Sequence, residues 1–209
     1  MSKYTTFSML KIETIYHHIL CQALENKKFS HTQQEIAVEY GYSLSTISHA
    51  LEIPTSIGAI RKTSRFFVLE DFKKLLYFWA SKRVLSKDIV YSTYVAMPVC
   101  ELETSVPAQS IFACYSCVTH LVSEPPADYS KVYVYLDKPY VSLAKKRFPT
   151  VKAKSPEHNL FVLKATDHIL RSKNITSVPQ TFVDLWGLSD WYSKDFLKVL
   201  EEKMYGILS

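Results

Sequence analysis

The sequence predicts a mixed α/β (α+β) fold, with a helical first part and a second part that combines strands and helices. Apolar residues recur at three- and four-residue spacing in the first part, whereas β-branched and aromatic residues form short runs in the second. Of the 209 residues, 47% are hydrophobic and 22% are charged. This balance supports one large or two small globular domains and excludes intrinsic disorder as the main state.

The first two predicted helices follow from periodicity and capping residues. Residues 9–24 place apolar side chains on one stripe, as in an amphipathic helix. Thr32 is a good N-cap for a second helix, and Glu35 completes a capping box three residues later. We expect that helix to end at Gly41, because glycine readily adopts the left-handed conformation that closes helices.

After Gly41 the spacing of the apolar residues is first helical, then strand-like, and then helical again. Ser43 is expected to cap a third helix that runs to about Leu51, and Pro54 is expected to end it. Residues 57–69 predict two short strands around a polar turn, and residues 70–84 return to a helical pattern. The first part is therefore predicted as helices followed by a hairpin and one more helix.

After Asp88 β-branched and aromatic residues become frequent, and residues 131–136 alternate as a strand does. We therefore place a boundary near residue 88, between a first domain of residues 1–88 and an α/β domain of residues 89–209. The elements expected in the second domain are strands at 89–96, 131–136, 150–153 and 159–163 and helices at 110–122 and 189–205.

The charge of the chain is moderately positive, with 25 Lys and Arg against 20 Asp and Glu and a formal net charge of +5. The first 88 residues hold 12 of the basic and 8 of the acidic residues, a surplus of four, and the remainder holds 13 against 12. The positive surplus therefore belongs mainly to the first domain. It permits binding of nucleic acid but does not require it.

Three residues within 33–51 have the spacing of a helix-turn-helix motif. Ala37 supplies a small side chain where two helices cross, and Gly41, four residues later, suits a turn with positive φ. Ile47, six residues further on, can anchor the second helix in the core. The segment resembles the helix-turn-helix class, and the hairpin after it resembles the wing of the winged variant. The alternative is that two short helices around a glycine match the pattern by chance.

In this interpretation the second helix of the motif reads DNA and the hairpin is a wing. That helix carries no Arg or Lys for bidentate guanine contacts, so sequence preference would depend on hydroxyl groups, His49 and DNA shape. The basic residues of the hairpin suit phosphates or a minor groove, although a solvated hairpin tip is their ordinary role. The residues expected to contact double-stranded DNA are Thr32, Gln33, Ser43, Ser45, Thr46, Ser48, His49, Arg61, Lys62 and Arg65.

A second motif precedes the last predicted helix. It consists of Val178, Pro179, Gln180, Thr181, Asp184 and Leu185. This run resembles the V-x-P-x-Q-T-x-x-D-L run near the end of AbiEi-type antitoxins of type IV toxin–antitoxin systems, except that Val and Pro are adjacent here. The order of the preceding helix and strand is similar, so the resemblance covers most of the chain.

The resemblance implies a winged helix joined to an α/β domain, in a protein that represses its own operon and neutralises a nucleotidyltransferase-type toxin. The alternative is that the motif residues are purely structural. Asp184 would then cap or pair at the start of a helix, Gln180 would bond to the backbone, and Leu185 and Trp186 would lie in the core.

The sequence shows no catalytic or metal-binding pattern, so we expect neither enzyme activity nor a cofactor. Its four glycines include no G-x-G pair, which excludes a Rossmann fingerprint, a Walker loop and a nucleophile elbow. Cys114, Cys117 and His120 offer three candidate metal ligands, but structural zinc needs four. Buried thiols are therefore the expected role of these cysteines.

We expect a cytoplasmic protein without a membrane partner. Lys3, Lys11 and Glu13 interrupt any signal-peptide core near the start. The longest stretch free of Asp, Glu, Lys and Arg, residues 104–123, is too polar to lie in hydrocarbon. The four cysteines are expected to be reduced thiols.

The expected function is that of a DNA-binding transcriptional regulator of the antitoxin type. The alternative is a non-catalytic protein-interaction module, or a replication or repair accessory module, that keeps a winged fold. On the helix predicted at 70–84, Leu75, Leu76 and Trp79 are expected to face the core, and Tyr77 and Phe78 to point elsewhere. These two side chains would contact a second copy in a weak homodimer or a dimer on DNA, or would be covered within the chain.

Overall fold

The computed structural model describes residues 3–150 and 157–208, with side chains from residue 11 onward. The chain divides into two compact units. Unit 1 extends to Lys82 and includes the last residues from Met204, and unit 2 covers Arg83–Lys203. Helices occur in both units and each contains one small sheet, so the predicted mixed α/β class is confirmed.

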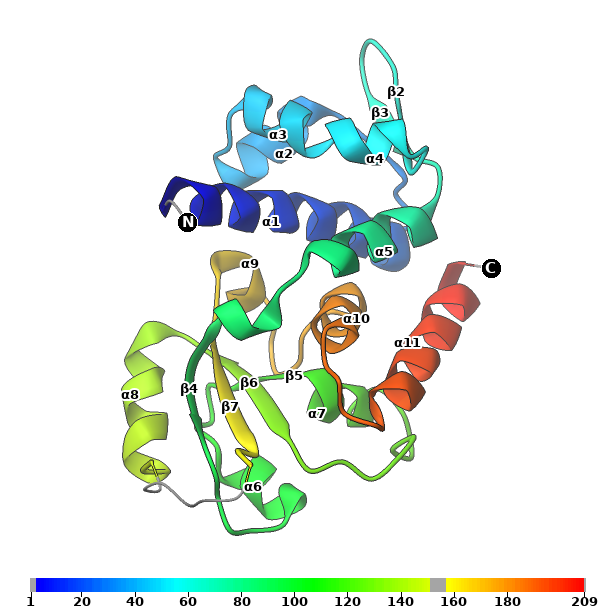
Figure 1. Cartoon of the computed structure of the whole chain (residues 1–209). Helices are drawn as coiled ribbons and strands as arrows, with labels where there is room; N and C mark the ends of the chain where they lie inside the picture. Colours follow the sequence, from blue (N-terminus) through cyan, green and yellow to red (C-terminus); the bar gives the residue numbers. More distant parts are fainter. Residues whose placement is uncertain (1–2, 151–156, 209) are drawn as a thin grey trace. The chain divides into compact units, whose positions relative to one another are not determined.

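Unit 1 is built mainly from helices (Figure 1). The first helix packs against the third and the fifth, and Leu75, Leu76 and Trp79 of the fifth are buried, as the sequence predicts. Ile15 and Ile19 of the first helix are fully buried in the same unit. The helices of unit 1 are α1 (Lys3–Asn26), α2 (Gln33–Tyr40), α3 (Leu44–Ala50), α4 (Glu52–Ser56) and α5 (Phe72–Lys82).

A three-stranded antiparallel sheet completes unit 1. Its strands are β1 (Ser30–His31), β2 (Ile60–Lys62) and β3 (Phe67–Leu69), in the order β1-β3-β2. Phe67 on the central strand lies opposite both His31 and Lys62 and is 1% exposed. The hairpin predicted within residues 57–69 is confirmed. β1 was not predicted, because two residues are too few to show an alternating pattern.

The prediction that Pro54 ends the third helix is wrong. α3 ends at Ala50, and Pro54 is a buried residue in the first turn of α4. Proline is tolerated there because the first amides of a helix have no acceptor within the helix. The Pro54 carbonyl instead accepts the Ala59 amide at 2.9 Å, which helps to lead the chain into β2.

Unit 2 contains a four-stranded mixed sheet with the order β4-β7-β6-β5. β6 and β7 are parallel, and the other two pairs are antiparallel. The strand expected at 150–153 lies almost entirely outside the described residues. The elements are β4 (Ile89–Thr93), α6 (Val99–Ser105), β5 (Ile111–Ala113), α7 (Cys114–Thr119), β6 (Val132–Leu136), α8 (Lys138–Arg147), β7 (Leu160–Lys164), α9 (Asp167–Leu170), α10 (Val178–Trp186) and most of α11 (Ser193–Leu208), with a 3₁₀ turn at Leu85–Lys87. The last residues of α11, from Met204, belong to unit 1.

Both faces of this sheet are covered, and β6 shows how the sequence achieves it. All five of its residues are buried. Val132, Val134 and Leu136 join a core with residues of α6, α8 and β7. Tyr133 and Tyr135 alternate with them and therefore face the opposite side, where α7 and α10 lie (Figure 1). The alternation of aliphatic and aromatic residues thus separates two buried layers.

The helix expected at 110–122 is only partly correct. Residues 111–113 form β5, with Phe112 paired to Val134 of β6, and α7 begins at Cys114. Cys114 has a φ of 50°, in the left-handed region that non-glycine residues rarely adopt. The pairing of residues 111–113 with β6 therefore overrides the helical pattern that the sequence shows at these positions.

Candidate nucleic-acid interface

The turn between α2 and α3 brings together the three residues of the predicted motif. Gly41 has a φ of 64°, and its amide donates to the Ala37 carbonyl. Another L-residue at that φ would cost about 1–2 kcal/mol. Ala37 is buried on α2 and Ile47 is fully buried on α3. The local geometry therefore agrees with the spacing of the motif.

The expected caps of both helices are confirmed. The Thr32 hydroxyl accepts a hydrogen bond from the Glu35 amide at 3.1 Å, and the Ser43 hydroxyl accepts one from the Thr46 amide at 3.3 Å. Gln33 is the first residue of α2 and is partly exposed. Thr32 and Ser43, which were expected to contact DNA, therefore already have structural roles as N-caps.

The hydroxyl groups at the start of α3 bond to one another. Ser43 Oγ lies 2.9 Å from Ser45 Oγ and 2.9 Å from Thr46 Oγ1. Ser45 is exposed, whereas Thr46 and Ser48 are half-buried. A ligand at this end of the helix would exchange these internal bonds for its own. The net gain per hydroxyl would therefore be small.

The other end of α3 carries the only ionisable side chain of this helix. His49 is exposed, and its Nδ1 lies 3.3 Å from a carboxylate oxygen of Glu52, the first residue of α4. The acidic neighbour makes the surroundings of the imidazole more negative. His49 is therefore accessible to a base edge, but it stands next to a charge that phosphates would repel.

The basic residues of the β2–β3 hairpin differ in how they are engaged. Arg61 Nε forms a 2.6 Å ion pair with Glu70, which follows β3. Lys62 Nζ donates to the Ser48 carbonyl of α3 at 3.4 Å and so links the hairpin to this helix. Arg65 is exposed in the turn, and within the described residues its guanidinium forms no ion pair. Of the three, Arg65 is the one available to a ligand without loss of a bond.

The motif and hairpin together carry little positive charge. Residues 32–70 contain three Lys and Arg and four Asp and Glu, a formal charge of −1. The positive surplus of the first 88 residues therefore lies outside this segment. Lys28, which precedes it, forms a 2.8 Å ion pair with Glu35. Counterion release by this surface would be limited, because few cations are free to neutralise phosphates.

Several large apolar side chains of the same segment are exposed. Val38 on α2 is 72% exposed and Leu44 at the start of α3 is 49% exposed. Ile53 and Ile57, on and after α4, and Phe66 in the hairpin turn are exposed as well. Such side chains contact thymine methyl groups in DNA complexes and apolar surfaces in protein complexes.

A buried pair of histidines lies within unit 1. His18 of α1 and His31 of β1 have ring centroids 5.5 Å apart and are 6% and 1% exposed. Nε2 of each ring has no hydrogen-bond partner among the described residues. Burial lowers the pKa of both, and the nearby Lys28 lowers it further, while Glu35 raises it. Neutral imidazoles are therefore the stable forms near pH 7.

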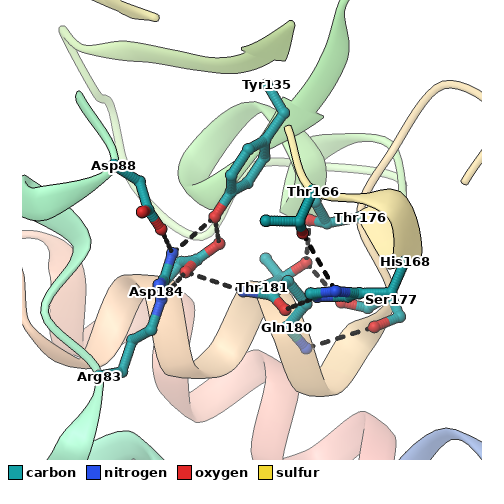
Figure 2. A network of polar contacts seen from close by, with 10 residues as sticks. All are labelled: Arg83, Asp88, Tyr135, Thr166, His168, Thr176, Ser177, Gln180, Thr181 and Asp184. Carbon is teal, nitrogen blue, oxygen red and sulfur yellow. Dashed lines mark hydrogen bonds and ion pairs between the residues drawn. The ribbon is translucent and has the colours of Figure 1, made fainter. Parts of the chain in front are cut away.

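In unit 2 the polar residues of the second motif, Gln180, Thr181 and Asp184, belong to a buried polar network (Figure 2). Asp184 is fully buried and accepts from Arg83 Nε at 2.8 Å, Tyr135 Oη at 2.8 Å and Gln180 Nε2 at 3.0 Å. The Arg83 guanidinium also lies 2.7 Å from a carboxylate oxygen of Asp88. Burial raises the pKa of Asp184, and the charge of Arg83 opposes that rise.

The network continues along α10 through short-range contacts. Thr181 Oγ1 donates to the Ser177 carbonyl at 2.8 Å, and Gln180 Oε1 lies 3.5 Å from His168 Nε2. The structural interpretation of the motif needs three corrections. Asp184 lies inside α10 rather than at its start, the Gln180 side chain bonds to side chains, and Trp186 is 42% exposed. Leu185 is fully buried, as expected.

The cysteine and histidine cluster of the sequence does not assemble into a metal site. Cys114 and Cys117 are fully buried, and burial raises the pKa of both thiols. His120 is exposed, and its ring lies 5.4 Å from that of Phe112. In the described part of the chain, no group of three or more His, Cys, Asp or Glu side chains is placed to hold a metal ion.

None of the helices in the described ranges is long and apolar enough to span a membrane. No protein-family model matches the chain, and a comparison with curated proteins gives no match. The resemblance to AbiEi-type antitoxins therefore rests on the motif at 178–185 and on the order of the elements.

Proposed function

We propose that this protein is a cytoplasmic DNA-binding transcriptional regulator of the antitoxin type, with a winged helix-turn-helix in unit 1. The observation that carries the proposal is the local geometry of the motif. α2 and α3 flank Gly41 at a φ of 64°, and the β2–β3 hairpin follows in the position of a wing. Lys62 bonds to the Ser48 carbonyl and would hold that wing next to the recognition helix.

In this proposal α3 enters the major groove and the hairpin contacts the backbone of double-stranded DNA. Ser45, Ser48 and His49 would face base edges, and Arg65 would contact a phosphate. Ser45 and Ser48 have short side chains, so the helix backbone could approach the bases closely at these two positions. Because few cations are free, we expect the affinity for DNA to depend on the shape of the DNA and on the pairing of two copies of the protein on a repeated site.

The resemblance of residues 178–185 to AbiEi-type antitoxins extends the proposal to a second partner. The protein would repress its own operon and neutralise a nucleotidyltransferase-type toxin. Asp184 and Gln180 would contribute by holding unit 2 together rather than by touching the toxin, because both are buried.

A second candidate function is a non-catalytic protein-interaction module, such as a replication or repair accessory protein. Two observations favour it. Residues 32–70 have a formal charge of −1, and Val38 and Leu44 expose apolar surface on α2 and α3. Exposed apolar side chains without surrounding cations suit a protein surface better than a phosphate backbone.

An electrophoretic mobility shift assay with the DNA upstream of the protein's own gene tests the regulator against this alternative. Binding at 50 mM salt that weakens at 200 mM and exceeds binding to a scrambled duplex supports the regulator. No shift with either duplex at 50 mM salt would contradict it. The test variant combines Ser45→Ala with His49→Ala on α3. The matched control is Ser142→Ala, at an exposed position of α8 in unit 2.

A further inference from the structure

The positive charge of unit 2 is concentrated on α8. This helix of ten residues carries Lys138, Lys145, Lys146 and Arg147 and no Asp or Glu, a formal charge of +4. Unit 2 as a whole holds 15 Lys and Arg against 13 Asp and Glu, so the remainder of the unit has a formal charge of −2. α8 is therefore a positive segment in a unit that is otherwise slightly negative.

The four cations of α8 are exposed, and within the described residues none of them forms an ion pair. Lys131 of the same unit, in contrast, forms 2.6 Å ion pairs with both Glu157 and Asp190. Asp137, the N-cap of α8, accepts a hydrogen bond from the Lys138 amide at 2.7 Å. A polyanion could therefore bind the α8 cations without breaking an ion pair between described residues.

The helix macrodipole accounts for only part of this charge. Cations are favourable in the last turn of a helix, which here contains residues 145–147. Lys138 lies in the first turn, where the same dipole makes a cation unfavourable. Lys138 and Lys145 are seven residues apart, so they share one face of the helix at a separation of about 10 Å along its axis. The charge therefore extends over both ends of one exposed face.

Contacts with neighbouring elements hold two of these cations in place. Lys145 Nζ lies 5.6 Å from the centre of the Tyr91 ring on β4, and the Tyr91 hydroxyl donates to the Phe148 carbonyl directly after α8. Arg147 Nη1 donates to the Ser105 carbonyl at the end of α6 at 2.6 Å. Cations that are already ordered lose less conformational entropy when they bind a partner.

The composition of this surface favours a phosphate backbone over other anionic partners. α8, which is described throughout, exposes one large apolar side chain, Leu143, while Tyr140 is half-buried against the core. Protein interfaces have an apolar, aromatic core that is depleted in Lys, and helices that lie on membranes need a whole apolar face. Single strands are bound by stacking of bases on aromatic side chains. Duplex binding depends mainly on Lys and Arg that neutralise phosphates.

We propose that α8 is a second DNA-contacting surface of this chain and binds the sugar–phosphate backbone of double-stranded DNA. Its four cations would each neutralise a phosphate. The contact is independent of base sequence, because phosphates carry no sequence information. The choice of DNA rests on the proposed function. The attraction of phosphates does not, since α8 belongs to unit 2 and the helix-turn-helix motif to unit 1.

The test measures binding of the full chain to a labelled duplex of scrambled sequence by fluorescence anisotropy, at 50 mM and 200 mM salt. Lys145→Ala with Lys146→Ala should weaken binding about tenfold at 50 mM salt. The variant should also reduce the slope of log affinity against log salt by about two, because two phosphate contacts are lost. Unchanged affinity and slope would overturn the proposal, as would the absence of binding by the natural sequence at 50 mM salt.

Two controls separate the surface from the net charge of the protein. Lys194→Ala with Lys198→Ala removes the same charge from exposed positions of α11 and should leave affinity and slope nearly unchanged. An equal loss in this control would assign the effect to net charge and overturn the proposal. Ser142→Ala, which changes α8 without removing a charge, should alter neither quantity.

Competition experiments test the kind of partner. Unlabelled duplex DNA should displace the labelled duplex more effectively than single-stranded DNA or poly-glutamate at equal charge concentration. Equal or better competition by either of these would overturn the choice of double-stranded DNA.

The scrambled duplex keeps this test distinct from that of the proposed function. Tighter binding to the upstream DNA that persists while the α8 variant has no effect would overturn this inference alone. Sequence-independent binding that the α8 variant weakens would support this inference while contradicting the proposed regulator.

Discussion

Arg83 and Asp184 stand 101 residues apart in the chain and form a 2.8 Å ion pair that is almost closed to solvent. Their side chains are 5% and 0% exposed. Arg83 is the first residue of unit 2, and Asp184 belongs to α10 near its end. Because Tyr135 of β6 bonds to both partners, the pair connects the start of the unit, its sheet and α10 (Figure 2).

Breaking this ion pair should destabilise unit 2 strongly. Arg83→Met leaves a buried carboxylate without its cation, and Asp184→Leu leaves a buried guanidinium without one of its anions. Each change should cost about 3–5 kcal/mol in the free energy of unfolding. Urea unfolding, followed by the fluorescence of Trp186 and Trp191, measures this cost.

The double variant Arg83→Met with Asp184→Leu provides the control. Two apolar side chains can replace a buried ion pair at much lower cost than either single change, so the double variant should be more stable than the sum predicts. Additive losses would show that the two residues act through separate contacts.

Acid should destabilise unit 2 through His168. The side chain is buried, and burial lowers its pKa to about 4, with the charge of Arg83 also lowering it and a hydrogen bond to Gln180 opposing the shift. The unfolded chain therefore binds a proton near pH 6.5, whereas the folded chain resists it until about pH 4. The free energy of unfolding is therefore not reduced by His168 above pH 6.5. It decreases by up to about 3 kcal/mol as the pH falls from 6.5 towards 4.

Two measurements check this assignment. The ring signals of His168 in ¹H–¹³C spectra should titrate well below those of a model histidine. In urea unfolding between pH 7 and 4.5, His168→Gln should lose less stability than the natural sequence, because Gln does not titrate. A ring that titrates near pH 6.5 would contradict the predicted loss.

Local signals account for what the sequence predicts correctly. Thr32, Gly41 and Ser43 each determine a helix end through their own side chain or φ angle, and the structure places all three as expected. The same kind of signal was present for two helices that were not predicted. Asp137 caps α8, which has proline in its first turn, and Ser177 caps α10 by accepting the Gln180 amide.

Contacts between distant segments account for the rest. β5 forms because Phe112 pairs with Val134, which no local pattern encodes, and the positive φ of Cys114 then allows α7 to start directly. Whether a charged side chain of the candidate interface is free or paired also depends on tertiary structure. The hairpin position of Arg61 was predictable, but its pairing with Glu70 requires the register of β2 and β3.

Lys27 offers a test of backbone strain at the end of α1. Its φ is 54°, a left-handed conformation that glycine adopts without steric cost. Lys27 Nζ donates to the Ile207 carbonyl, and both Lys27→Gly and Lys27→Ala remove this bond. Lys27→Gly should therefore be more stable than Lys27→Ala by about 1 kcal/mol, measured as a shift in urea midpoint. Equal midpoints would show that the strain is relieved locally.

The ion pair between Arg61 and Glu70 predicts that the basic residues of the hairpin contribute differently to DNA binding. Arg65→Ala should weaken DNA binding and reduce the slope of log affinity against log salt by about one, because its guanidinium is free to contact a phosphate. Arg61→Ala should have a smaller effect, since Arg61 is held by Glu70. Glu70→Gln should release Arg61 and strengthen binding to all sequences at low salt, and Arg61→Ala should abolish that gain. Unchanged affinity for DNA in Glu70→Gln, together with weakened affinity in Arg61→Ala, would contradict this prediction. It would show that the 2.6 Å ion pair with Glu70 does not restrain Arg61 on DNA, and the proposed docking of the hairpin would need a different orientation.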